Sequence, residues 1–119
     1  MENLKNPILD KADNFFYAAK DELCRPEEDV VAYSVCRNAY YAVVNYLGSF
    51  LGEHGVEFQE KDQVDDLLKQ CRAIDGKFNT LNLSPMYRRA DTEDPWMNID
   101  MANDFIIMAE NTRKVVSGN

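Results

Sequence analysis

Residues 30–51 form a stretch of 22 residues in which Arg37 is the only charged residue, and the apolar residues recur at helical spacing. One face of such a helix collects aromatic and aliphatic side chains: Cys36, Tyr40, Val43, Leu47 and Phe50, extended by Tyr33, Val44 and Leu51. So much apolar surface must pack on other helices. The stretch predicts a long helix from about Glu27 to about Leu51, ending at Gly52 and Gly55 around His54, since glycine commonly stops helices.

The opposite face of this predicted helix carries a stripe of mainly small and amide side chains. Its members are spaced by 4, 3, 4, 3 and 4 residues: Ser34, Asn38, Tyr41, Asn45, Gly48 and Gly52. A solvated face would carry Lys and Glu instead, so we expect another surface to cover this stripe. Small residues allow a second backbone to approach, and amides can hydrogen-bond across a two-fold axis. We expect a homodimer interface here; a polar seam inside one chain is the alternative.

Three further segments have helical periodicity, and the sequence has no alternating Val, Ile and Thr runs of the kind that indicate strands. A first helix should follow Asn6 and Pro7, and a last helix should start at Asn98 or Asp100. The second helix should follow Pro26 and start at about Glu27, where three carboxylates suit a helix N-terminus: Glu27, Glu28 and Asp29. The remaining features are a third helix after Asp62, an interruption at Asp75-Gly76, and a short turn over residues 86–90 after Ser84-Pro85.

Each of these helices has a predicted inner face. The members are Ile8, Ala12, Phe15, Ala19 and Leu23 in the first helix, Val64, Leu67, Leu68, Cys71 and Ile74 in the third, and Ala102, Phe105, Ile106, Ala109, Thr112 and Val116 in the last. The expected fold class is all-α, an antiparallel, up-and-down bundle of four to five helices. We expect one domain over residues 1–119.

The charge balance limits the partners of this chain. With 13 Lys plus Arg against 21 Asp plus Glu, the net charge is −8, which argues against the broad basic surface that binds duplex nucleic acid.

No apolar run approaches the roughly 18 residues of a membrane span, and the N-terminus has no hydrophobic signal core. Cys24, Cys36 and Cys71 lack CxxC spacing and suit reduced thiols. We therefore expect a cytoplasmic protein that does not bind membranes.

Motifs of the common catalytic and metal sites are missing from the sequence. It contains no Gly-rich phosphate loop, no HExxH and no nucleophile elbow. Asp65 and Asp66 are adjacent on a helix and diverge by about 100°, which does not make a metal site. His54 lies at a predicted helix end and is interpreted as a turn residue. We expect neither a metal nor a cofactor, with a nucleotide as the one ligand considered.

The predicted long helix resembles the HEPN (higher eukaryotes and prokaryotes nucleotide-binding) family. Ala39-Tyr40-Tyr41-Ala42 matches the centre of that family's second-helix pattern, Ser-Arg-Ala-Tyr-Tyr-Ala-x-x-His. Tyr87-Arg88-Arg89-Ala90-Asp91 is similar to its Arg-x-x-Ala-Asp stretch before the last helix. The resemblance covers nearly the whole chain, and it implies an antiparallel bundle that dimerises through the second helix.

The same resemblance argues against catalysis. Ribonucleases of the family use an Arg and a His on this helix, and alignment on Ala39-Tyr40-Tyr41-Ala42 places Asn38 and Asn45 at those positions. An amide neither shuttles a proton near neutral pH nor neutralises a phosphate. Arg37 is one residue out of register, and no His follows it at the required spacing. We therefore expect no catalytic residues.

The expected function is a non-catalytic, HEPN-like dimeric binding or regulatory module. The resemblance implies either a minimal nucleotidyltransferase as its partner, in a toxin-antitoxin or defence system, or a nucleotide bound in the dimer groove. The candidate anion-binding residues are Arg37, Arg88 and Arg89; surface pairing with Glu or Asp is the alternative. Trp96 is expected to cover the bundle end or to stack on a base. Two other functions stay open: a ribonuclease with a non-standard site at Arg37 and His54, and an acidic inhibitor or immunity protein.

Overall fold

The computed structural model describes residues 7–59, 61–87 and 98–117, and these residues form helices and connections without a strand. The four α-helices are α1 (Pro7–Leu23), α2 (Ala32–Glu53), α3 (Val64–Ile74) and α4 (Ile99–Val116). Three short 3-10 turns accompany them: η1 (Glu27–Asp29), η2 (Gly76–Thr80) and η3 (Ser84–Tyr87). The predicted all-α bundle is confirmed. None of the described helices has the length and apolar character needed to cross a membrane.

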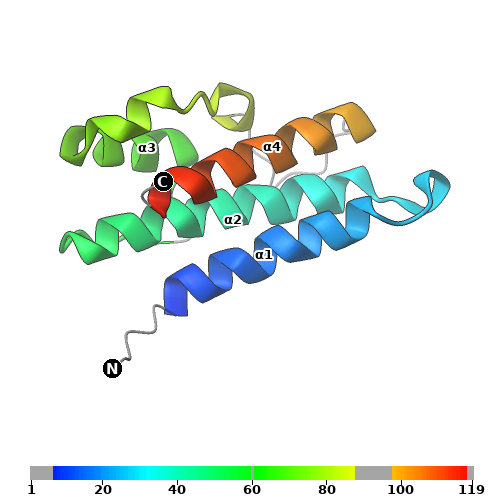
Figure 1. The fold of residues 1–119 in the computed structure, drawn as a ribbon, viewed down its shortest axis with the longest axis horizontal. Coiled ribbons are helices and arrows are strands. Elements are labelled where there is room, and N and C mark those ends of the chain that lie inside the picture. The colour runs from blue at the N-terminus through cyan, green and yellow to red at the C-terminus, as the bar shows by residue number, and fades with distance from the viewer. Residues whose placement is uncertain (1–6, 60, 88–97, 118–119) are drawn as a thin grey trace.

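Helix α2 is the centre of the bundle and packs between α1 and α4 (Figure 1). Every residue from 42 to 51 is buried, so this part of α2 is covered on all sides. A helix that is apolar around most of its circumference can persist only under such cover. The predicted long helix and its apolar face are therefore present, and its central position is a finding of the structure.

The directions of the helices follow from contacts between their ends. The early α1 residue Asp13 contacts Tyr46 in the second half of α2 and Arg113 in the last turn of α4. α1 therefore runs antiparallel to α2 and to α4, whereas α2 and α4 run in the same direction, as Figure 1 also shows.

The start of α2 differs from the sequence prediction. Glu27, Glu28 and Asp29 form the separate turn η1, and α2 begins only at Ala32. The two residues between them are extended, with ψ of 128° at Val30 and 97° at Val31. The backbone N–H of Val31 donates a hydrogen bond of 2.9 Å to a carboxylate oxygen of Glu22 at the end of α1, which holds the chain out of the helix.

The inner face of α1 also differs by one position. Ala12 and Ala19 are buried as predicted, but Phe16 is buried in the core whereas Phe15 is only half-buried. Phe15 instead turns toward Tyr41 of α2, with the two ring centroids 5.6 Å apart. This rotation places an aromatic ring at the surface between α1 and α2.

The other helix limits agree with the sequence. Asn98 caps α4, because its side-chain oxygen accepts a hydrogen bond from the N–H of Met101. α3 ends at Ile74, and the carboxylate of Asp75 then accepts from the N–H of Lys77. The inner faces are buried except for Ile74, which is 40% exposed, and for residues at helix ends. Residues 88–97 lie outside the described residues.

Candidate functional site

The stripe of small and amide residues on α2 is divided between the interior and the surface of one chain. Asn45 is 2% exposed and Gly48 is buried, whereas Ser34, Asn38 and Tyr41 are half-buried. Gly48 is covered by Phe58, since a Cβ at this glycine would lie only 2.3 Å from the Phe58 ring. The expectation that Asn45 and Gly48 face a second chain is therefore corrected: the chain covers them itself.

Asn45 is engaged within its own helix. Its side-chain N–H donates a hydrogen bond of 2.8 Å to the carbonyl of Tyr41, one turn earlier. The polar seam inside one chain, which was the alternative interpretation, describes this half of the stripe. The half that stays accessible extends from Ser34 to Tyr41.

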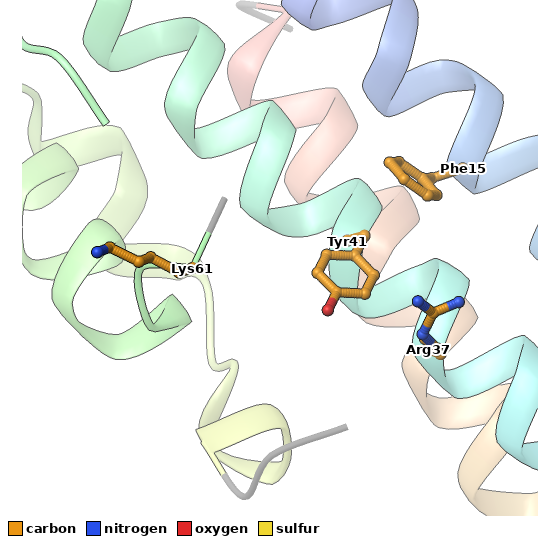
Figure 2. A pocket seen from close by; sticks show the side chains of 4 residues that line it. All are labelled: Phe15, Arg37, Tyr41 and Lys61. Atoms are coloured by element: carbon orange, nitrogen blue, oxygen red, sulfur yellow. The ribbon is translucent and has the colours of Figure 1, made fainter. Parts of the chain in front are cut away.

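Beside this accessible half lies an open hollow of about 320 Å³. The described residues that line it are Phe15 of α1, Arg37 and Tyr41 of α2, and Lys61 of the α2–α3 connection (Figure 2). The Arg37 guanidinium carbon lies 5.3 Å from the centroid of the Tyr41 ring. Tyr41 also has Phe15 at a tilt of 34° and the edge of Tyr40 at 5.6 Å, so neighbours hold its ring on two sides.

Lys61 lies apart from the other three lining residues. In the view of Figure 2 its ammonium points away from Tyr41. A lysine side chain has four rotatable bonds and readily changes direction. An anion that contacted both Arg37 and Lys61 would draw the ammonium into the hollow.

The two cations of the hollow have no carboxylate partner within the described part of the chain. The ion pairs that the structure shows among these residues involve Arg25, Arg113 and Lys114. Arg37 and Lys61 thus place two cations beside one hollow in a chain with a net charge of −8. The expected alternative for Arg37, pairing with a carboxylate, is not found among the described residues.

This arrangement fits the binding of an anion with a planar apolar part. A guanidinium donates two parallel hydrogen bonds to a phosphate or carboxylate, and a half-buried aromatic ring can offer its face for stacking. The lining residues that the structure describes are two aromatic rings and two cations: Phe15, Tyr41, Arg37 and Lys61.

His54 is not part of the hollow. It caps α2, its ring lies 4.3 Å from that of Phe50, and its Nδ1 is 3.0 Å from the Phe50 carbonyl oxygen. Because 17 residues of helix separate it from Arg37, the two lie roughly 25 Å apart along the axis. A ribonuclease site that combined Arg37 and His54 of one chain is therefore excluded by distance.

The sequence analysis missed a second polar cluster between α1, α2 and α4. The fully buried Tyr46 donates a hydrogen bond of 2.5 Å to Asp13, and Arg113 donates to the same Asp13 oxygen at 3.3 Å. Arg113 also donates to the hydroxyl of Tyr17 at 3.1 Å. Burial, together with the hydrogen bond to Asp13, raises the pKa of Tyr46 well above its ordinary value. The sequence signal that could have revealed this cluster was the charged residue Asp13, which lies between Ala12 and Phe16, two residues that α1 buries.

The three cysteines are free thiols, as expected. Burial raises the pKa of Cys36 to about 11 and that of Cys71 to about 12, whereas Cys24 is exposed.

No group of His, Cys, Asp and Glu side chains able to hold a metal occurs among the residues that the structure describes. Arg88, Arg89 and Trp96 lie outside those residues.

Comparisons of the chain with models of protein families, with curated proteins and with solved structures found no match.

Proposed function

We propose that this chain is a non-catalytic, HEPN-like binding or regulatory module that acts as a homodimer and binds a nucleotide in the hollow beside Arg37 and Tyr41. The observation that carries the proposal is the Arg37 guanidinium, which lies against the Tyr41 ring and pairs with no carboxylate among the described residues of this acidic chain. Arg37 would hold a phosphate group, and the rings of Tyr41 and Phe15 would pack on the base. The family resemblance adds a minimal nucleotidyltransferase of a toxin-antitoxin or defence system as the protein partner.

The dimer in this proposal uses the accessible half of the α2 stripe. Val31, Ser34 and Asn38 follow each other at helical spacing, and Val31 is 50% exposed just before α2 begins. An exposed β-branched residue followed by small and amide side chains provides both apolar contact and hydrogen-bonding groups for a second copy. Asn45 and Gly48 take no part in this interface.

The ligand proposal is tested by isothermal titration of the full chain with ATP, adenosine and inorganic triphosphate. ATP should bind more tightly than adenosine, which lacks phosphate, and than triphosphate, which lacks the base. Arg37→Ala should weaken ATP binding by about tenfold or more, the usual effect of losing hydrogen bonds to a charged group. The matched control is Arg25→Ala, an exposed arginine that pairs with Glu22 outside the hollow. If ATP does not bind to the wild type, or binds equally well to Arg37→Ala, the nucleotide site is disproved.

A further inference from the structure

Phe58, in the segment that leads from α2 toward Lys61 and the hollow, packs on the buried residue Gly48 of α2. A Cβ at Gly48 would lie 2.3 Å, 2.4 Å and 2.4 Å from three atoms of the Phe58 ring, so the ring occupies the space that any other residue's side chain would need. Phe58 belongs to the segment that we call the strap, residues 56–59 and 61–62, which leads from α2 to α3. The strap is thus seated on α2 at one glycine.

The start of the strap is fixed at the end of α2. Gly55 has a φ of +80°, a value that favours glycine, and it reverses the chain direction. The N–H of Val56 then donates a hydrogen bond of 2.9 Å to the carbonyl of Leu51. These two features direct Phe58 back onto the helix.

The far end of the strap carries Lys61. The N–H of Gln59 donates to the Asp62 carboxylate at 2.8 Å, and the N–H of Asp62 donates to the Gln59 carbonyl at 2.9 Å. These reciprocal hydrogen bonds bracket Lys61, which lines the hollow. Lys61 thus lies in a closed turn whose first residue, Gln59, directly follows Phe58.

The residue on which Phe58 is seated and the tyrosine that lines the hollow with Lys61 lie on the same face of α2. Gly48 and Tyr41 are seven residues apart, which places them on one face and about 10 Å apart along the axis. A strap seated at Gly48 can thus hold Lys61 near the Tyr41 part of the hollow. Neither Gly48 nor Phe58 lines that hollow within the described residues.

From this geometry we infer that Phe58, seated on Gly48, is a positioning residue that holds Lys61 as the second cation of the anion site. The inference rests on the proposed function and adds how the site is kept complete. A bound phosphate that draws in the Lys61 ammonium should in turn stabilise the seated strap, because coupling between two equilibria is reciprocal.

The test compares ATP affinities of matched glycine variants, measured by isothermal titration without added metal. Gly48→Ala should weaken ATP binding about fivefold by displacing Phe58, and Phe58→Ala and Lys61→Ala should each have a similar effect. Gly52→Ala is the control, because no atom lies within 4 Å of a Cβ at Gly52 on the same helix, and its affinity should equal that of the wild type. Phe58→Leu should retain most of the affinity.

A double-mutant cycle separates positioning from a general structural effect. If Phe58 acts through Lys61, adding Phe58→Ala to Lys61→Ala should cause no further loss of ATP affinity. Amide hydrogen exchange at Phe58 and Gln59 should also slow when ATP is bound to the wild type. Phe58→Ala introduces no clash, so the cycle does not depend on the folding of Gly48→Ala.

Each result decides between the two proposals. ATP binding that is unchanged in Phe58→Ala, or losses that add fully in the cycle, would overturn the positioning role and leave the nucleotide site standing. Failure of the wild type to bind ATP would overturn the nucleotide site and the positioning role together.

Discussion

The phenol of Tyr46 donates a hydrogen bond of 2.5 Å to Asp13, joining the buried centre of α2 to α1. Tyr46 is 0% exposed, whereas the Asp13 side chain is 33% exposed and also receives Arg113 of α4. One carboxylate therefore connects three helices. Asn45, Ser49 and Thr112 are also buried polar residues, and the side chains of Asn45 and Thr112 each donate a hydrogen bond within their own helix.

Removing the tie between Tyr46 and Asp13 should lower stability by an amount that depends on which partner is removed. Tyr46→Phe should cost about 1.5–3 kcal/mol, the usual range for a hydrogen bond to a charged group. Asp13→Ala should cost at least as much, because it leaves the buried Tyr46 hydroxyl without its acceptor. Urea unfolding of the two single variants and the double variant measures the coupling between Tyr46 and Asp13.

Lys114→Ala is the control, because it breaks only an exposed pair with Glu110, and it should change stability by less than about 1 kcal/mol. Independent, additive losses for Tyr46→Phe and Asp13→Ala would contradict the tie.

Two glycines of α2 should respond in opposite directions to the same substitution. Gly52→Ala adds a methyl group in open space and should raise stability by about 0.5 kcal/mol through helix propensity. Gly48→Ala forces the Phe58 ring off the helix and should lower stability by about 1–3 kcal/mol, as overpacking usually does. Thermal unfolding followed by circular dichroism measures both. Stabilisation by Gly48→Ala would mean that Phe58 does not cover this position.

Stability should fall as the pH rises above 9. Burial raises the pKa of Cys36 to about 11 and that of Cys71 to about 12 from an ordinary 9.0, so both thiols keep their protons in the folded chain. Below pH 9 the two thiols are protonated in the folded and in the unfolded chain, so their contribution to the free energy of unfolding is fully present. Between pH 9 and 11 the unfolded chain loses protons that the folded chain keeps, and the free energy of unfolding should decrease by up to about 2.7 kcal/mol per pH unit. Urea unfolding across this pH range measures the slope.

Cysteine variants identify the groups responsible for that slope. Cys36→Ala and Cys71→Ala should each remove about half of it between pH 9 and 10, since each thiol accounts for one proton. Above pH 10 Tyr46 adds to the decrease, because its pKa is also raised. Cys24→Ser is the control and should leave the slope unchanged, because Cys24 is exposed. An unaltered slope in both alanine variants would refute the assignment.

The proposed dimer predicts twice the chain mass in light scattering. Ser34→Glu and Asn38→Glu place charges on the accessible half of the α2 stripe and should shift the population toward monomer. Asn111→Glu, at an exposed position on α4, should not change the mass. Wild-type protein that scatters as a monomer at every concentration tested would eliminate the dimer.

Local signals in the sequence located most helix ends correctly. Pro7 begins α1, Asn98 caps α4 through its side chain, and Asp75 follows the last residue of α3. These residues act on neighbours within one turn, so their effect can be read without knowing the fold. The α2 start was wrong because its determinant, the Glu22 carboxylate bound to the Val31 N–H, comes from nine residues away.

The candidate site was predictable only in part. The sequence singled out Arg37 and Tyr41 on one helix, but Phe15 was assigned to the core and Lys61 was not considered. Both belong to other segments, and only the rotation of α1 and the path of the strap bring them to the hollow.

By itself, then, the sequence determined the all-α class, the long and nearly uncharged helix and its apolar face, because helical periodicity and end signals are local properties. Only the tertiary structure decided what covers the opposite face. Asn45 and Gly48 suit a second chain as well as they suit Phe58, and the choice depends on where the strap returns after Gly55. Packing between distant segments is the physical reason, since no spacing along one helix specifies which surface will meet it.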